Sequence, residues 1–496
     1  MRKYIALRSI MLVSVVLLIV HIFCPATAQA GAETSPAGQA MLKGGCAKVN
    51  ITPPLGIPLI GSAGKPSDDI IDELYAKALV LNDGRTTIAI VSVDLLYSPL
   101  EEITNPIREI IKEKIGIPEQ NVLICATHTH SGPEVFTRSK LRPEQKVPPS
   151  EIDQSYLQTL IRKTASSVMI AYKNMQESSR KAGSTSRKAG SQVKIGAAKG
   201  QIPEIVYNRR PKLADGSVRM AFTLPPEVTA TKKIETDAKG NVKVTFTLPD
   251  EEAELDFGPI DPEVCVLRVE DMNGEIVGSL VNFGCHPVCI YPYLSTTISA
   301  DYPAYTTGVV EQIEGGVCLF ALGLAGNTVP IQRGVKPRQQ IGKALGGESL
   351  RRLQLVSTVG DVTLNALKKE IRFPTKTASS SNKSPAPASP DASRGGGKDV
   401  DEKNYITTEI QVLRLGDIYI LGLPGEILVE VGLEIKRRAG VEKLFVISLS
   451  NDTIGYVCHS QAYEEGGYEP VSGTNLAKGA GEIMIREALD LINQTK

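Results

Sequence analysis

Short apolar runs that end in polar turns are the feature that most constrains the fold of this chain. Residues 122–126 and 418–423 are apolar throughout, which is typical of strands buried on both faces of a sheet. Segments with helical spacing of apolar residues separate such runs, as in the stretch that follows Asp153. Strands that alternate with helices in this way predict an α/β fold, with mixed β-sheets and flanking helices in a single large domain.

Two β-hairpins are predicted from turn residues. Apolar, β-rich segments flank Asn82-Asp83-Gly84, and a second pair flanks Asn273-Gly274. Asn-Gly and Asp-Gly turns between such segments are strong short-range hairpin signals. We therefore expect antiparallel strand pairs at both places.

The N-terminus has the layout of an export signal. Basic residues precede an apolar run over residues 10–23, and small residues follow at 28–30. The apolar run is short for a bilayer span, which needs roughly 20 residues, so cleavage is favoured over an uncleaved membrane anchor. We expect residues 1–30 to be a cleavable signal peptide and the protein to be secreted or periplasmic.

The rest of the chain is predicted to form one domain over residues 44–496, with two polar segments inside it. Residues 179–191 repeat a Ser-Arg-Lys-Ala-Gly-Ser unit that has nothing apolar to pack, which predicts a mobile loop. Residues 378–403 are rich in Ser, Pro, Ala and Gly, which predicts a disordered insertion.

Charge excludes one class of partner. Lys and Arg together number 55, as do Asp and Glu, and no long basic run appears. A nucleic-acid-binding protein needs a basic surface, so nucleic acid is excluded as a partner.

Polar side chains that can bind a metal follow four of the predicted strands. They are His128 and His130, His286, Glu426 and Tyr456. Because the carboxyl ends of strands line the ligand crevice of an α/β sheet, these side chains can converge. Hydrolytic zinc takes about three His or carboxylate ligands from the protein and leaves one position open for water. Two histidines and Glu426 could supply these three ligands. The alternative is that the histidines are hydrogen-bonded structural residues and that Glu426 is an acid in the first turn of a helix, where the helix dipole favours it.

A competing metal site would use thiols. Cys285, Cys289 and Cys458, with His286 or His459, could form a structural zinc site, but they lack Cys-x-x-Cys spacing. We expect these cysteines to be small buried apolar residues instead.

Seven short motifs run in one order along residues 44–490. They are Lys48-Val49-Asn50-Ile51-Thr52-Pro53-Pro54, Val93-Asp94-Leu95, Thr127-His128-Thr129-His130-Ser131-Gly132-Pro133, Asn208-Arg209-Arg210, Gly284-Cys285-His286-Pro287, Pro424-Gly425-Glu426 and Gly455-Tyr456-Val457. Together they resemble the N-terminal catalytic domain of the neutral, non-lysosomal ceramidase family. The Thr-His-Thr-His block is specific to that family, and the other motifs are supportive.

The resemblance implies roles for individual residues. It places His128, His286, Glu426 and Tyr456 on the family's zinc ligands. It makes His130 a catalytic histidine that could bind the oxyanion or pass a proton to the leaving amine. It also assigns substrate contacts to two residues, Arg209 and Asn327, with a structural salt bridge as the alternative for Arg209.

Two departures from the family pattern matter. The family's serine nucleophile lies in a Gly-Asp-Val-Ser-Pro turn, whereas this chain has Val329 at the serine position and Thr328 one residue early. Valine cannot attack a carbonyl, so a metal-activated water is the expected nucleophile. The family's full enzymes also append a β-sandwich domain after the tyrosine motif, which this sequence does not include, so specificity for ceramide is left open.

We therefore expect a ceramidase-like, zinc-dependent hydrolase that cleaves the linear amide C–N bond of an N-acylated lipid or related N-acyl compound. The alternatives are a zinc esterase acting on another acyl substrate and a catalytically degenerate, metal-containing binding protein. Contact with a membrane surface is left open, and the sequence predicts no protein partner.

Overall fold

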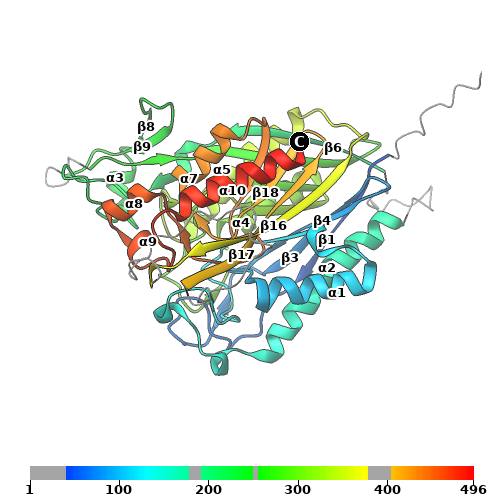
Figure 1. Cartoon of the computed structure of the whole chain (residues 1–496), viewed down its shortest axis with the longest axis horizontal. Helices are drawn as coiled ribbons and strands as arrows, with labels where there is room; N and C mark the ends of the chain where they lie inside the picture. The colour runs from blue at the N-terminus through cyan, green and yellow to red at the C-terminus, as the bar shows by residue number, and fades with distance from the viewer. Residues whose placement is uncertain (1–40, 178–191, 250–254, 378–403) are drawn as a thin grey trace, which may run out of the picture. The chain divides into compact units, whose positions relative to one another are not determined.

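The computed structural model describes residues 41–177, 192–249, 255–377 and 404–496 (Figure 1). The expected signal peptide, the loop predicted at 179–191 and the insertion predicted at 378–403 lie outside the described residues. Residues 40–496 form one compact unit.

The first of three four-stranded sheets is built near the N-terminus. It contains β1 (Lys43–Asn50), β3 (Tyr75–Asn82), β4 (Thr87–Val93) and β5 (Val122–Ala126), in that order. The first three strands are antiparallel neighbours, and β5 runs parallel to β4. Helix α1 (Asn105–Ile115) makes the crossover between them, with Pro106 in its first turn, where the missing N–H costs no hydrogen bond.

Two further sheets repeat this connection pattern. The second contains β6 (Val193–Gln201), β11 (Glu263–Asp271), β12 (Ile276–Phe283) and β14 (Val317–Leu322), with α4 (Tyr302–Glu314) before the last strand. The third contains β16 (Leu364–Pro374), β17 (Tyr405–Leu415), β18 (Ile418–Gly422) and β20 (Lys443–Ile447), with α7 (Val429–Arg438) before the last strand. In each sheet the last two strands are parallel, so their carboxyl ends lie at the same edge.

The remaining helices and strands connect and cover the sheets. They are β2 (Asp69–Ile70), α2 (Gln154–Gln176), β7 (Val206–Asn208), α3 (Pro226–Thr229), β8 (Lys233–Thr236), β9 (Val242–Thr245), β10 (Pro259–Ile260), β13 (Thr297–Ile298), β15 (Thr328–Pro330), α5 (Val335–Leu355), β19 (Glu426–Ile427), β21 (Tyr456–Val457), α8 (Ser460–Glu465), α9 (Tyr468–Val471) and α10 (Ala480–Thr495).

One apolar core takes side chains from all three sheets. It includes Leu79 of β3, Leu267 of β11 and Ile420 of β18, all fully buried. Because strand side chains alternate between faces, the neighbouring residue Val80 points the other way and joins a second core under the helices. Both faces of the sheets are therefore covered, as the apolar runs in the sequence predicted.

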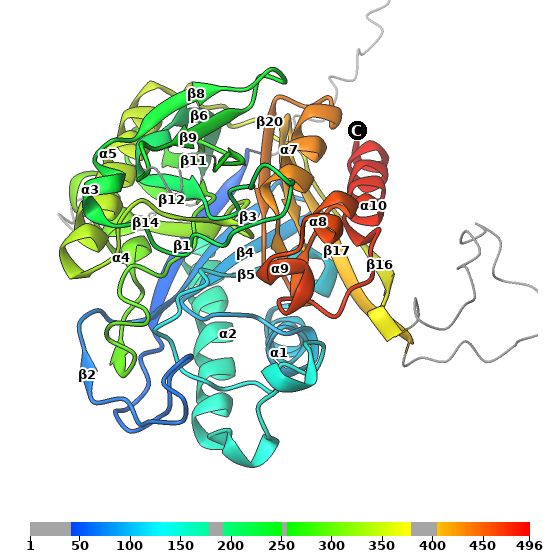
Figure 2. The ribbon, with the colours of Figure 1, turned by 90° about the vertical axis from the view of Figure 1, so that its left-hand side faces the viewer.

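Helices cover the outer faces of the sheets. Figures 1 and 2 show α1 and α2 beside the first sheet and α10 along β16 and β17, and α4 and α5 pack together against the second sheet. In the described ranges, no helix is long and apolar enough to cross a bilayer.

The predicted fold class is confirmed, because mixed sheets with flanking helices form one large domain. Both predicted hairpins are also confirmed. Asn82 pairs with Thr87 across the first turn, and Glu270 pairs with Ile276 across the second.

Candidate metal centre

Four strand ends deliver the candidate ligands to one place. His128 lies two residues after β5, and His286 lies three residues after β12. Glu426 and Tyr456 begin β19 and β21, which pair in parallel with these two residues directly opposite each other. All four residues are almost fully buried. The backbone of His128 has a φ of 69°, which turns the chain sharply at this point.

Two imidazoles converge on a single oxygen of Glu426. The Nε2 atom of His128 is 3.2 Å from Glu426 Oε2, and the Nε2 atom of His286 is 3.1 Å from the same oxygen. The phenol oxygen of Tyr456 lies 3.4 Å from His286 Nε2. The donor atoms of four residues therefore surround one small volume.

The hydrogen bonds on the far side of each ring set its tautomer. His128 Nδ1 is 3.0 Å from the carbonyl oxygen of Leu96, and His286 Nδ1 is 3.2 Å from that of Thr328. A carbonyl only accepts, so each Nδ1 carries a proton and donates it. In a neutral ring, Nε2 then presents a lone pair.

The Nε2 atom of His286 and the Oε2 atom of Glu426 face each other as two acceptors. Burial, followed by the nearby charge of Arg209, lowers the pKa of His286 to about 4, so this ring is neutral at neutral pH. The pKa of Glu426 lies well below its usual range because His128 and His286 oppose the cost of burial, so its carboxylate is ionised. A lone pair and a carboxylate oxygen that face each other at hydrogen-bond distance call for a cation between them.

The spacing fits zinc. Zinc binds His nitrogen and carboxylate oxygen at about 2.0–2.1 Å, and a tetrahedral arrangement then places ligand atoms roughly 3.3 Å apart. The separations of 3.1, 3.2 and 3.4 Å found here lie close to that value. Each His also has the carbonyl partner on its second nitrogen that metal-binding histidines usually have.

His130 lies beside this centre but does not share its contact with Glu426. Its ring centroid is 4.8 Å from that of His128 and 5.2 Å from that of Tyr291. His130 Nε2 is buried and finds no hydrogen-bond partner among the described residues. Burial and the neighbouring histidines hold the pKa of His130 well below its usual range, so the ring is neutral. Within the described residues, the ligand atoms of His128, His130 and His286 lie within 4.8 Å of one another.

Arg209 connects the centre to a buried carboxylate. Its Nη2 donates to the Tyr456 hydroxyl at 3.1 Å and to the Gly326 carbonyl at 2.9 Å. Its Nε donates to Glu469 at 2.8 Å, and Glu469 is fully buried. The salt bridge named as the alternative for Arg209 is therefore present, and it holds the guanidinium against Tyr456.

The side chain of Asn327 bonds to the start of α7. Its oxygen accepts from the backbone N–H of Val429 at 2.8 Å, and its nitrogen donates to Glu430 at 2.9 Å. Both contacts lie in the first turn of α7. The other predicted site residues gather at the imidazoles. Asn327 lies beside Arg209, whose backbone N–H its carbonyl accepts at 2.8 Å, and its side chain holds the start of α7.

The turn that departs from the family pattern lies within the core. Val329 is fully buried in β15, opposite Tyr207 of β7. The hydroxyl of Thr328 lies 3.0 Å from the Gly284 carbonyl and 3.1 Å from the Leu324 carbonyl. Its hydrogen bonds are therefore taken up by the backbone. Neither side chain is available as a nucleophile.

The thiols do not assemble a metal site. Cys285 and Cys289 belong to one apolar cluster and Cys458 to another. Burial raises the pKa of all three thiols well above the usual range, so they stay protonated. They are small buried apolar residues.

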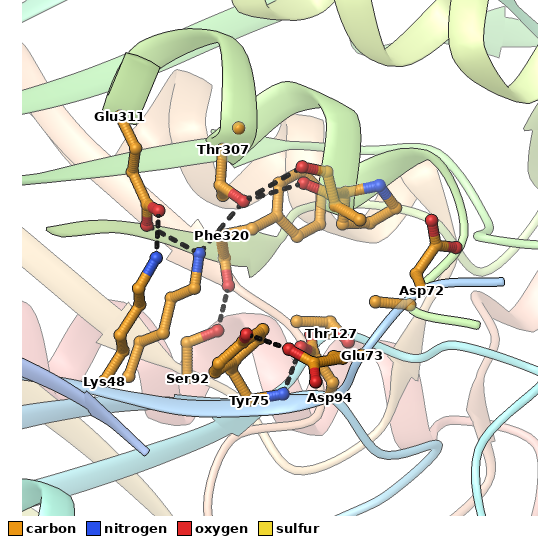
Figure 3. A pocket seen from close by; sticks show the side chains of 15 residues that line it. Lys48, Asp72, Glu73, Tyr75, Ser92, Asp94, Thr127, Thr307, Glu311 and Phe320 are labelled. Carbon is orange, nitrogen blue, oxygen red and sulfur yellow. Dashed lines mark hydrogen bonds and ion pairs between the residues drawn. The ribbon is translucent and has the colours of Figure 1, made fainter. Parts of the chain in front are cut away.

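A cavity of about 260 Å³ adjoins Thr127, the residue before His128 (Figure 3). On one wall Lys77 forms an ion pair with Glu311 at 2.8 Å. On another, Asp94 Oδ2 accepts the backbone N–H of Tyr75 at 2.8 Å. Burial raises the pKa of Asp94 to about 6 although Lys77 opposes the shift. Asp94 thus anchors the start of the loop that follows β4.

Sequence reasoning missed two residues that support the centre. Tyr97 donates its hydroxyl to Glu426 Oε1 at 3.0 Å, and Glu469 holds Arg209. The strand-end signal that identified the histidines could have found Tyr97, because its loop follows β4, the parallel neighbour of β5. Glu469 lies in a short helix after the last strand and carries no comparable signal.

Three mixed sheets and converging buried side chains define an α/β protein with a candidate metal centre. No family model matches the sequence. Solved ceramidase structures share its fold. Neutral ceramidase from Pseudomonas aeruginosa matches with a TM-score of 0.65 and 17% identity, over 91% of this chain and 74% of that chain. A ceramidase complexed with C2 matches with a TM-score of 0.65 and 16% identity, over 91% of this chain and 75% of that chain. The chain therefore has a ceramidase-like fold.

Proposed function

We propose that this protein is a zinc-dependent hydrolase that cleaves the amide bond of an N-acylated lipid or a related N-acyl compound. The observation that carries the proposal is the approach of two imidazole nitrogens to one carboxylate oxygen, at 3.1 and 3.2 Å. The ceramidase-like fold supports the choice of an amide substrate. The predicted export signal supports a place of action outside the cytoplasm.

His128, His286, Glu426 and Tyr456 would hold the ion. When bound, zinc supplies a Lewis acid that polarises the acyl oxygen and lowers the pKa of water to about 7. Arg209 keeps the Tyr456 hydroxyl in place through its own contact with Glu469. The ligand positions are thus supported by groups that are themselves buried and bonded.

His130 is the group of this chain that would move a proton. Its unpartnered Nε2 can accept a proton from the attacking water and return it to the leaving nitrogen. The water oxygen then joins the acyl carbon as the C–N bond breaks, which yields a carboxylic acid and an amine. Since Val329 stands at the position of the family's serine, no covalent acyl intermediate is needed.

The test compares the purified chain with a His128→Ala variant. Metal content and amine release are measured on a panel of N-acyl substrates that includes ceramide, with acyl esters alongside. We expect about one zinc ion per chain and amide turnover, both lost in the variant, because His128 supplies one ligand to a shared ion.

A matched histidine change controls for general damage. His459 is only partly buried, and its ring accepts the backbone N–H of Ala462 at the start of α8. His459→Ala should keep both zinc and turnover. Turnover of esters alone would favour the esterase, bound zinc without turnover would favour a binding protein, and a wild-type chain without zinc would overturn the proposal.

A further inference from the structure

Tyr97 occupies a position between two of the proposed ligands. It lies in the loop 94–98 that follows β4, and its side chain is buried. Its ring packs at 5.6 Å from the ring of His128 and at 5.7 Å from that of Phe136. Its hydroxyl donates to Glu426 Oε1 at 3.0 Å. One side chain therefore contacts both His128 and Glu426, which come from different sheets.

The two oxygens of Glu426 have different partners. Oε1 accepts from Tyr97, whereas Oε2 faces the Nε2 atoms of His128 and His286. A carboxylate held at one oxygen cannot rotate to offer both oxygens equally. The hydrogen bond thus decides whether a metal ion would be bound by Oε2 alone or by both oxygens of Glu426.

The loop that carries Tyr97 is itself fixed at both ends. Asp94 is tied to Tyr75 by its side chain and its backbone N–H, and Ser98 donates to the Leu449 carbonyl at 3.2 Å. Between them, the Leu95 carbonyl accepts the backbone N–H of His128 at 2.9 Å, and the Leu96 carbonyl accepts its Nδ1 at 3.0 Å. The loop therefore positions the backbone, the ring and the carboxylate partner of His128 together.

We propose that Tyr97 is a positioning residue that holds Glu426 with Oε2 alone directed at the imidazoles. This inference rests on the proposed metal site. Removal of the hydroxyl in Tyr97→Phe leaves the ring packed against His128 and Phe136 but frees Oε1. Loss of such a supporting hydrogen bond typically weakens metal binding by about 10–100-fold.

The test measures zinc affinity by competition with a chromophoric chelator and records the visible absorption of the cobalt-loaded protein. Tyr156→Phe is the matched control, since Tyr156 is also buried and donates its hydroxyl to a backbone carbonyl, that of Ile51, away from the centre. We expect Tyr97→Phe to raise the Kd for zinc by about 10–100-fold and to change the cobalt spectrum. Tyr156→Phe should leave both unchanged.

The outcomes separate this inference from the proposed function. A wild-type chain that binds no zinc would sink the metal site and, with it, the role of Tyr97. Zinc binding with equal affinity and identical cobalt spectra in wild type and Tyr97→Phe would overturn the positioning role alone. Equal losses in Tyr97→Phe and Tyr156→Phe would show general destabilisation, which also overturns it. The melting temperature without metal shows whether both variants fold.

Discussion

His130 and His128 are two residues apart and face the same volume, but their partners differ. His128 contacts Glu426 at 3.2 Å, whereas His130 Nε2 has no partner among the described residues. We expect His130→Ala to keep zinc but to lower kcat by about 10²–10⁴-fold, the usual contribution of a proton-transferring group. Metal analysis and steady-state kinetics on the same sample check this. Loss of zinc together with activity would instead make His130 a ligand.

At the residue level, most residues of the centre could be predicted because they come just after apolar, strand-like runs. His128, His286, Glu426 and Tyr456 each follow an apolar run, and the structure gathers them. The positions of their partners could not be predicted in this way. Leu96 and Thr328 contribute only backbone carbonyls, which any residue could supply. The direction of the Asn327 side chain depends on where α7 begins in space, which no local pattern specifies.

At the level of elements, α2 lies against the backbone of β1 where Gly45 has no side chain. A Cβ atom at Gly45 would lie 2.3 Å from the Ala171 carbonyl oxygen and 2.5 Å from the Met175 nitrogen, both in the α2 backbone. Because backbone cannot step aside like a flexible side chain, Gly45→Ala should force the helix outward. We expect it to lower the free energy of unfolding by about 1–3 kcal/mol, measured by urea denaturation.

Gly347 supplies the matched control for this change. It lies in α5, is exposed, and has open space where a Cβ would stand. Gly347→Ala should raise the free energy of unfolding by up to about 1 kcal/mol, because alanine restricts the unfolded chain and favours helix. Equal stability of Gly45→Ala and wild type would show that α2 does not press on β1.

Elements were more predictable than their assembly. The hairpins at Asn82 and Asn273 follow from local turn chemistry, although the second contains a register shift between Val269 and Glu270 that the turn does not predict. The pairing of β6 with β11 joins strands that lie far apart in the chain, and the shared core of three sheets depends on many such pairings. Local periodicity carries no information about such long-range pairings. The packing of three four-stranded sheets around one core was therefore seen only in the structure.

At the level of the whole molecule, Asp94 should make the free energy of unfolding depend on pH. Its pKa is raised from 3.8 to about 6, chiefly by burial. The folded protein then binds a proton more tightly than the unfolded chain, so stability falls as pH rises through this interval. Asp94→Asn removes the effect. From about pH 4 to pH 8, the variant should gain on the order of 3 kcal/mol relative to wild type.

Urea unfolding at several pH values, with a chelator in every sample, measures this difference without a contribution from bound metal. The difference should be established once the pH exceeds about 6, where Asp94 is ionised in both states of the wild type. Parallel stability profiles for the two proteins would contradict the raised pKa.

The scatter of the centre along the chain has a consequence for biosynthesis. His128 and His286 leave the ribosome before Glu426 and Tyr456, which begin the late strands β19 and β21. Domains fold as their chain emerges, from the N-terminus onward. A nascent or stalled polypeptide can therefore display both imidazoles but cannot enclose a cation between them. On the proposed function, the protein would acquire its reactive state only when synthesis has passed Tyr456, and shorter chains would be inert.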